Sequence, residues 1–252
     1  MIRPRIIPCL LLSDGGLVKT VNFKNPKYVG DPLNVVKILN EKEVDELVLL
    51  DINNSTRKKE IDFKLIEKIA SECRMPLCYG GGVTKTSDFQ ALINIGVEKV
   101  AISTSIFDSR DILTKASGLV GSQSVVVVLD VKRENGQYIL YLSNGTKRTS
   151  YEVLDFLKTI DQSQIGEIVI NSIDRDGTMA GYDFDLLEYV YSHVRVPLTF
   201  LGGAADSVNI RQLFLRYGNV GAGVGSLFVF KGKFKAVLVN YPSGNEKFEI
   251  IK

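Results

Sequence analysis

The sequence has few of the residues from which metal sites and disulfide frameworks are built. Its 252 residues include one histidine, His193, and three cysteines, Cys9, Cys73 and Cys78, without a CxxC pair. An odd number of cysteines argues against a disulfide framework, and the lack of a CxxC pair together with a single histidine argues against a zinc site. We therefore expect buried free thiols, no metal and no cofactor, and we expect His193 to be a surface or helix-capping residue.

Long hydrophobic runs and a charge excess are also missing. The N-terminal apolar stretch is about seven residues long before Asp14, too short for a signal-peptide core or a membrane span. The formal charge is only +2, without a dense Lys/Arg block, which disfavours nucleic acid as the main partner. With 45% hydrophobic and 24% charged residues, the composition is that of a soluble globular protein. We expect a cytoplasmic protein that binds neither nucleic acid nor membranes.

Short apolar runs alternate with amphipathic stretches along the chain. The runs predict strands at 5–12, 46–52, 76–80, 99–104, 124–131, 167–173, 197–201 and about 221–227. Apolar residues three and four apart predict helices near 32–43, 62–74, 85–95, 109–119, 150–162, 184–193 and 207–217. This alternation favours an α/β fold, a single (β/α)8 TIM barrel domain over residues 1–252. An open doubly wound sheet is the alternative, but its glycine fingerprint after the first strand is missing.

An internal repeat predicts a barrel made of two similar halves. The matching positions, 121 residues apart, are Glu46 and Glu167, Gly81-Gly82 and Gly202-Gly203, and Ser105 and Ser226. Cys9-Leu10-Leu11 falls near Val128-Leu129-Asp130 at an offset of 119. Two half-barrels of four strands each would produce this register, so we expect a two-fold half-barrel repeat.

The same repeat predicts two phosphate-binding cradles where strands end. Glycines let backbone N–H groups approach phosphate oxygens closely, and hydroxyl groups add donors. One cradle contains Gly82, Ser103 and Thr104, and the other contains Gly203, Gly225 and Ser226. Two cradles in register favour a bisphosphorylated or elongated ligand, and helix-capping turns are the alternative for each.

The segment from Glu167 to Asp183 has the character of a buried strand that opens into a polar loop. Its apolar start gives way to Asp174, Asp176 and Gly177, and in α/β folds the chemistry collects where such strands end. We assign Asp176 and Gly177 to a phosphorylated ligand, and an ordinary surface turn is the alternative.

Charged residues mark the opposite ends of the strands. Arg5, Glu46, Lys99 and Glu167 stand at the first positions of predicted strands, which places all four on the N-terminal, bottom face of a barrel. Two positive and two negative groups there can close into a ring of ion pairs around the axis. Solvated boundary charges are the alternative.

Two further features belong to the expected mouth of the barrel. Asp51, at the end of the second predicted strand, is expected to hydrogen-bond substrate or to brace the barrel top. Residues 133–150 alternate like a hairpin with Asn144-Gly145 as its turn, and we expect this hairpin to rise beside the mouth.

From Arg5 to about Phe230 the chain resembles the cyclase subunit of imidazole glycerol phosphate synthase. The matching motifs are RIIPCL, NFKNPKYVGDP at 22–32, DELVLLDI, GGGV, GSQSVVVVLDVKR at 121–133, SIDRDGT with GYD at 172–183, and GGA at 202–204. The resemblance implies a glutaminase that docks on the bottom face and releases ammonia. The ammonia would pass a charged gate and travel through the barrel to a bisphosphorylated substrate at the top.

The resemblance also implies roles for single residues. Arg5, Glu46, Lys99 and Glu167 match the family's gate. Asp130 matches a catalytic acid–base carboxylate and Lys19 a catalytic lysine in a mobile loop. Glu98 stands where the family has an aspartate that faces the glutaminase.

Several positions depart from the family pattern. Leu11 replaces the family's first catalytic aspartate, Ser103 replaces an asparagine in one cradle, and Leu201 replaces a serine before the other Gly-Gly pair. Beyond Phe230 the sequence is shorter and less helical than the family's last helix. A leucine cannot transfer a proton, so the resemblance implies a conserved gate and altered chemistry.

That combination looks like a side branch of the family encoded with surface-polysaccharide genes. Proteins of this branch accompany a glutaminase-like partner and a sugar amidotransferase that builds acetamidino groups, and CLLL and the NYPS of residues 240–243 resemble them. We therefore expect a barrel that delivers ammonia for sugar amidation, with a glutaminase and a sugar amidotransferase as partners. A true histidine-biosynthesis cyclase–lyase is the first alternative, and an unrelated phosphosugar isomerase is the second.

Overall fold

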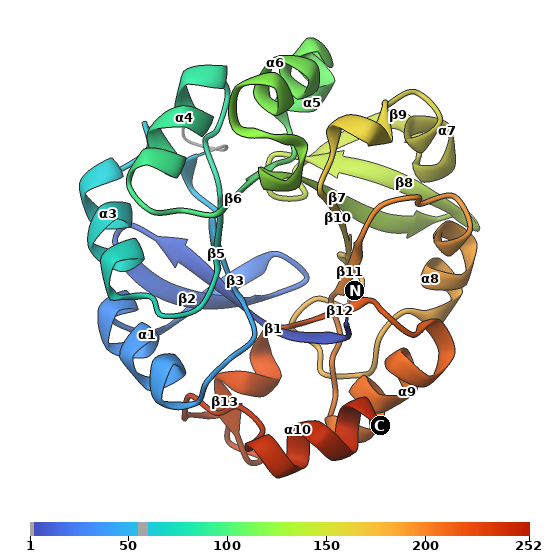
Figure 1. The fold of residues 1–252 in the computed structure, drawn as a ribbon. Helices are drawn as coiled ribbons and strands as arrows, with labels where there is room; N and C mark the ends of the chain where they lie inside the picture. Colours follow the sequence, from blue (N-terminus) through green and yellow to red (C-terminus); the bar gives the residue numbers. More distant parts are fainter. Residues whose placement is uncertain (1–2, 55–59) are drawn as a thin grey trace.

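Eight parallel strands close into a barrel in the computed structural model, which describes residues 3–54 and 60–252 (Figure 1). They are β1 (Arg5–Ser13), β4 (Leu47–Asp51), β5 (Leu77–Gly80), β6 (Lys99–Ile102), β7 (Val125–Glu134), β10 (Glu167–Ser172), β11 (Leu198–Leu201) and β12 (Gly221–Val224). Each strand pairs in parallel with the next, and the pairing of β12 with β1 closes the circle. The predicted (β/α)8 TIM barrel is confirmed.

Helices surround the barrel on its outer side (Figure 1). They are α1 (Pro32–Glu41), α3 (Phe63–Glu72), α4 (Thr86–Asn94), α5 (Ser105–Asp108), α6 (Asp111–Val120), α7 (Val153–Leu157), α8 (Phe184–Tyr191), α9 (Ser207–Tyr217) and α10 (Gly244–Ile251), with short 3-10 turns at η1 (Ser122–Ser124), η2 (Gln162–Gln164) and η3 (Ser226–Phe228). Asp31, Asp62, Asp183 and Asp206 cap α1, α3, α8 and α9, since each carboxylate accepts a backbone N–H of the first turn. Such caps stabilise a helix by about 1 kcal/mol each.

Side chains along each strand alternate between the helix layer and the barrel axis. In β1, Leu10 and Leu12 belong to the large core that faces the helices, while Ile7 and Cys9 belong to a second buried cluster. This period of two therefore places Leu11 on the axis side, above Cys9. The second cluster also holds valines of β4, β7 and β10, so the middle of the barrel is apolar.

The half-barrel repeat is visible in the backbone conformation of two glycines, Gly81 and Gly202. Gly81 has φ +120°, and a Cβ there would lie 2.3 Å from the carbonyl oxygen of Asp51. Gly202 has φ +101°, and a Cβ there would lie 2.6 Å from the carbonyl oxygen of Ser172. Gly81 and Gly202 are 121 residues apart, and so are the two contacting residues, Asp51 and Ser172. At both positions the positive φ angle and the close carbonyl oxygen leave no space for a side chain, so both positions require glycine.

Antiparallel strands extend two of the barrel strands at the carboxyl-end rim. β2 (Gly16–Val21) pairs with β1 and with β3 (Lys24–Gly30), while β8 (Gln137–Leu142) and β9 (Lys147–Glu152) continue from β7. The predicted turn at Asn144-Gly145 joins β8 to β9, and a second turn at Asn135-Gly136 was not predicted. The helix predicted at 150–162 is wrong at its start and its end, because β9 runs to Glu152 and α7 ends at Leu157.

The C-terminal part returns to the barrel after β12. A small hairpin of β13 (Phe230–Lys231) and β14 (Ala236–Val237) precedes α10. Ser243 and Glu246 form a capping box that starts this helix. Among the described residues, no helix has the length and apolar character required to span a membrane.

Candidate active site and ion-pair ring

Four charged side chains form a closed ring of ion pairs at the N-terminal ends of the strands. Arg5 lies 2.6 Å from Glu46 and 2.8 Å from Glu167, measured between nitrogen and oxygen atoms. Lys99 lies 2.7 Å from Glu46 and 2.8 Å from Glu167. The two glutamates are buried and the two cations are mostly buried. The structure thus brings together all four residues that the sequence placed on this face.

Ion pairing keeps Arg5, Lys99 and Glu167 charged in spite of their burial. Burial disfavours the charged forms, but attraction from Glu167 and Glu46 outweighs this effect and raises the pKa of both Arg5 and Lys99. For Glu167, burial is likewise outweighed by Lys99 and Arg5, so its pKa is lowered. The hydroxyl of Thr199 also donates a hydrogen bond to Glu167. Removing one cation would therefore leave a buried carboxylate with incomplete compensation.

Above the ring, two cysteine thiols of the apolar cluster stay uncharged at neutral pH. Burial raises the pKa of the Cys9 thiol to about 11, and the pKa of the Cys78 thiol is also raised well above its ordinary value by burial. Both belong to the apolar cluster in the middle of the barrel. Cys73 is free as well, but it is half-buried, so the expectation of buried free thiols holds for Cys9 and Cys78 only.

Asp130 lies at the opposite end of this apolar interior, at the barrel mouth. Asn171, its neighbour on β10, donates a hydrogen bond of 3.0 Å from Nδ2 to the Asp130 carboxylate. Burial raises the pKa of Asp130 to about 7, with a smaller contribution from the negative charge of Asp176, while the Asn171 hydrogen bond opposes the shift. A carboxyl group with a pKa near 7 can both accept and donate a proton at neutral pH.

Lys19 lies at the mouth, in the hairpin that connects barrel strand β1 to helix α1. It belongs to β2, and its Nζ donates a hydrogen bond to the carbonyl oxygen of Cys9. The same Nζ would lie 2.8 Å from a Cβ at Gly225, so the ammonium group stands against the second cradle. Lys19 also attracts Asp176, whose pKa is raised by burial in spite of that attraction.

The β2–β3 hairpin crosses the mouth and joins these groups. Asn22, in its turn, donates its backbone N–H to the carbonyl of Asp176 (2.9 Å) and its side chain to the carbonyl of Ile173 (2.9 Å). Phe23 reaches the β8–β9 turn, since a Cβ at Gly145 would lie 2.8 Å from its ring. The hairpin therefore connects β1 with the loops that follow β7 and β10.

The two predicted cradles differ in their contacts. In the first, Thr104 Oγ1 accepts the backbone N–H of Ser143 at 3.1 Å, and Ser103 is half-buried. In the second, Ser226 is buried at the start of η3. Gly82 and Gly203 both have positive φ angles, 73° and 98°.

Two polar residues at the mouth were left out of the predicted site, although the sequence repeat had matched Ser105 with Ser226. Asn171 Oδ1 and Ser105 Oγ are buried and have no hydrogen-bond partner among the described residues. Ser105 begins α5 directly after the first cradle, and Asn171 holds Asp130. The signal for Ser105 was its hydroxyl directly after the Ser103-Thr104 pair. Asn171 gave no signal, because it is a single asparagine inside an apolar strand.

The other sequence candidates lie away from the mouth or at its edge. His193 is exposed after the end of α8, as expected, and its carbonyl accepts a hydrogen bond from Gln162. Glu98 is exposed next to Lys99 on the ring face. Asp51 Oδ1 accepts the backbone N–H groups of Asn53 and Asn54, which braces the end of β4.

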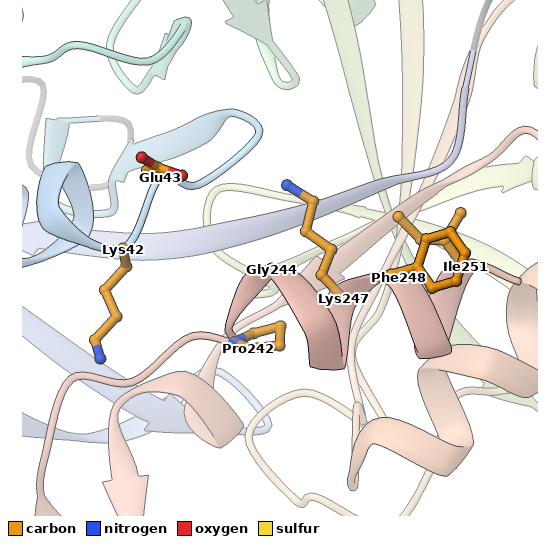
Figure 2. A pocket seen from close by; sticks show the side chains of 7 residues that line it. All are labelled: Lys42, Glu43, Pro242, Gly244, Lys247, Phe248 and Ile251. Carbon is orange, nitrogen blue, oxygen red and sulfur yellow. The ribbon is translucent and has the colours of Figure 1, made fainter.

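Two clefts open among the loops at the N-terminal ends of the strands. Figure 2 shows the first, with Lys42 and Glu43 after α1 on one side and Lys247 and Phe248 of α10 on the other. The second lies between the segments that precede β10 and β11 and includes His193. Within residues 3–54 and 60–252, no group of three His, Cys, Asp or Glu side chains is placed to hold a metal ion.

Comparisons with known proteins agree with this arrangement. Residues 5–235 match the family model described as "Histidine biosynthesis protein". A Vibrio vulnificus protein described as "Putative imidazole glycerol phosphate synthase subunit hisF3" is 52% identical over 249 residues, which cover 98% of this chain and 96% of that protein. A Pseudomonas aeruginosa protein described as "Putative imidazole glycerol phosphate synthase subunit hisF2" is 44% identical over 247 residues, 98% of each chain. The imidazole glycerol phosphate synthase subunit HisF of Streptococcus sanguinis is 35% identical over 229 residues, 90% of this chain and 91% of that protein. This chain belongs to the histidine biosynthesis protein family.

Proposed function

We propose that the chain is the cyclase subunit of an imidazole glycerol phosphate synthase. It receives ammonia at the end that carries the ion-pair ring and uses it on a bisphosphorylated substrate at the mouth. The observation that carries the proposal is the arrangement along one axis. Charged Arg5, Glu46, Lys99 and Glu167 lie at one end, an apolar interior follows, and Asp130 with its raised pKa lies at the other.

The comparisons favour this function over sugar amidation, which the sequence analysis preferred. The descriptions of all three relatives reported above contain the words "imidazole glycerol phosphate synthase subunit", preceded by "Putative" in the first two. One observation supports ammonia delivery for sugar amidation as a second candidate. Leu11, on the axis side of β1, puts an apolar side chain where acid–base chemistry needs a proton carrier.

The ring face supports a glutaminase as the partner. Neutral ammonia can enter an interior lined by apolar side chains and neutral thiols, whereas an ammonium ion would lose its hydration there at a high free-energy cost. The ring presents the charges that the molecule would meet before it enters the apolar interior. Both clefts open on this face, which offers recessed surface to a docking subunit.

The mouth supplies two carboxyl groups for proton transfer. Asp130 and Asp176 both have raised pKa values, chiefly because they are buried. A carboxylate repels phosphate, so we reassign Asp176 from phosphate binding to proton transfer. Lys19, against Gly225, is the cation that suits a phosphate group in the second cradle.

The test is turnover of the histidine-pathway bisphosphate substrate by the purified chain. With saturating ammonium, or with glutamine and a glutaminase subunit, we expect product, and we expect the rate to rise as pH passes about 7 because Asp130 must be ionised to accept a proton. Asp130→Asn should lower kcat by about 10²–10⁴-fold, while Asp155→Asn, on the exposed face of α7, should not. No turnover under either supply of ammonia would refute the cyclase and favour the second candidate.

A further inference from the structure

Two neighbouring hairpins on the carboxyl-end rim form a basic patch around an exposed aromatic side chain. We call it the rim patch, and its members are Lys24, Lys27, Lys231, Lys233, Phe234 and Lys235. The first two lie on β3, and the other four lie in the β13–β14 hairpin. All six side chains are exposed.

A direct contact holds the two hairpins side by side. Lys27 Nζ donates a hydrogen bond of 3.1 Å to the carbonyl of Lys235 and lies 5.0 Å from the centre of the Phe230 ring. Lys235 in turn donates its backbone N–H to Gly232 at 3.0 Å, which closes the tight turn of the second hairpin. The patch is therefore one continuous surface.

The apex of the second hairpin carries a large apolar side chain into solvent. Phe234 is 90% exposed, between Lys233 and Lys235, and Tyr28 on β3 is 65% exposed. Val237 and Leu238, which follow the turn, are also exposed. A protruding aromatic group with aliphatic neighbours and flanking lysines is typical of segments that insert shallowly into a membrane interface.

Positive charge is concentrated at this place. Residues 21–28 and 230–238 contain five lysines and no acidic residue, while the whole chain has a formal charge of +2. The rest of the chain is therefore net negative, and the near-neutral total conceals a strongly basic surface. Lysines close to a negatively charged bilayer are attracted to it over about a Debye length.

We propose that the rim patch binds the anionic headgroups of a membrane surface, with Phe234 inserted at the headgroup level and the lysines against lipid phosphates. Nucleic acid is a poorer fit, because bases stack on aromatic faces that line a groove, and Phe234 projects from the apex of a turn. This partner differs from the expectation drawn from the whole-chain charge. It would turn the barrel mouth towards the membrane and leave the ion-pair ring at the opposite end accessible to another subunit.

The test is co-sedimentation of the full chain with vesicles at low salt. On phosphatidylcholine vesicles in which roughly one third of the lipid is phosphatidylglycerol, we expect about tenfold more bound protein than on phosphatidylcholine alone, and we expect added salt to reverse the difference. Lys233→Glu combined with Lys235→Glu should abolish binding, and Phe234→Ala should lower it roughly fivefold by removing the inserted side chain. Leu215→Ala is the matched control, since Leu215 is exposed on α9.

Each outcome bears on the proposal directly. Equal binding to both kinds of vesicle, or binding to neither, would overturn it. Retention of the chain on single-stranded RNA without vesicle binding would assign the patch to nucleic acid and would also overturn it. Unchanged melting temperatures of the variants would show that lost binding reflects the surface, since all substituted side chains are exposed.

Discussion

Leu11 and Asp130 occupy related positions in the two half-barrels, but their side chains have opposite chemical character. They are 119 residues apart, and each stands near the carboxyl end of its strand. Both lie between the axis-facing apolar cluster and the mouth. Asp130 carries a carboxyl group whose pKa is about 7 because of burial. Leu11 offers only apolar surface on its side of the mouth, so the proposed function assigns proton transfer to Asp130 and Asp176.

The substitution Leu11→Asp should increase turnover of the bisphosphate substrate with saturating ammonium. A second positioned acid–base group commonly adds about 10²-fold to a rate, and position 11 is half-buried. The measurement is kcat with each variant at the same pH. Leu11→Asn, which has a similar shape without the carboxyl group, is the matched control and should give no gain. Equal gains from both variants would contradict the proton-transfer explanation, and no gain would point to the altered cradles at Ser103 and Leu201.

The placement of single residues could be predicted from the sequence where the position along a strand determines which residues lie nearby. The first positions of strands meet on one face of any parallel barrel, so the ion-pair ring followed from Arg5, Glu46, Lys99 and Glu167 once the strands were known. The hydrogen bonds of Asp176 could not be predicted in this way, because their donors lie in the β2–β3 hairpin that crosses the mouth.

At the level of elements, the barrel strands could be predicted because buried parallel strands are continuous apolar runs. The β2–β3 hairpin could not, since Asn22, Phe23 and Asn25 have positive φ angles and Pro26 interrupts the polar stretch that follows. Two register shifts between these strands further remove the regular alternation. The start of the predicted helix at 150 failed for a related reason. Its polar residues pair with β8 as a strand before α7 begins.

The C-terminal segment is fastened to the ring face by Tyr241. Its hydroxyl donates to the carbonyl of Ile6 at 2.9 Å, and Asp45, its neighbour, accepts the backbone N–H of Ile6 at 3.0 Å and pairs with Lys247 at 2.6 Å. Tyr241 is 3% exposed. The element that sequence reasoning expected to be less helical is thus held next to Arg5 and Glu46 by buried polar contacts.

Removing the hydroxyl with Tyr241→Phe should lower the free energy of unfolding by about 1–2 kcal/mol, because the buried carbonyl of Ile6 loses a partner that water cannot replace. Urea denaturation followed by circular dichroism measures the change. Tyr28→Phe, the same substitution at an exposed side chain, should alter it by less than about 0.5 kcal/mol. Similar values for the two variants would mean that the C-terminal contact contributes little.

For the whole molecule, the barrel separates its charged features along one axis. The ring lies at the N-terminal ends of the strands, Asp130 and Asp176 lie at the mouth, and the rim patch lies beside the mouth. The closed sheet was predictable from the alternation of strands and helices, whereas the rim patch needed the contact between two hairpins far apart in sequence. A partner on the ring face and a surface at the rim can therefore bind without competition.

The ring also links stability to pH across the whole barrel. The pKa of Glu167 is lowered from its ordinary value of 4.5, so its contribution to stability is present above that value and lost as pH falls through the folded pKa. The pKa of Lys99 is raised from its ordinary value of 10.5, so its contribution is present below that value and lost as pH rises through the folded pKa. Between these limits both Glu167 and Lys99 are charged, and their contribution to stability is fully present.

Lys99→Met should therefore lower the free energy of unfolding most between pH 5 and pH 9, by about 3 kcal/mol, because Glu46 and Glu167 stay buried with Arg5 alone. In acid the difference from the unmodified chain should shrink as Glu167 is protonated. With a glutaminase subunit, product formed per glutamine hydrolysed should fall, while turnover with free ammonium should hold, since the mouth is unchanged. Lys115→Met, which removes an exposed lysine 4.0 Å from Asp111, is the control for both measurements. A normal product-to-glutamine ratio in Lys99→Met, together with the loss of stability, would mean that the ring holds the barrel together and takes no part in the passage of ammonia.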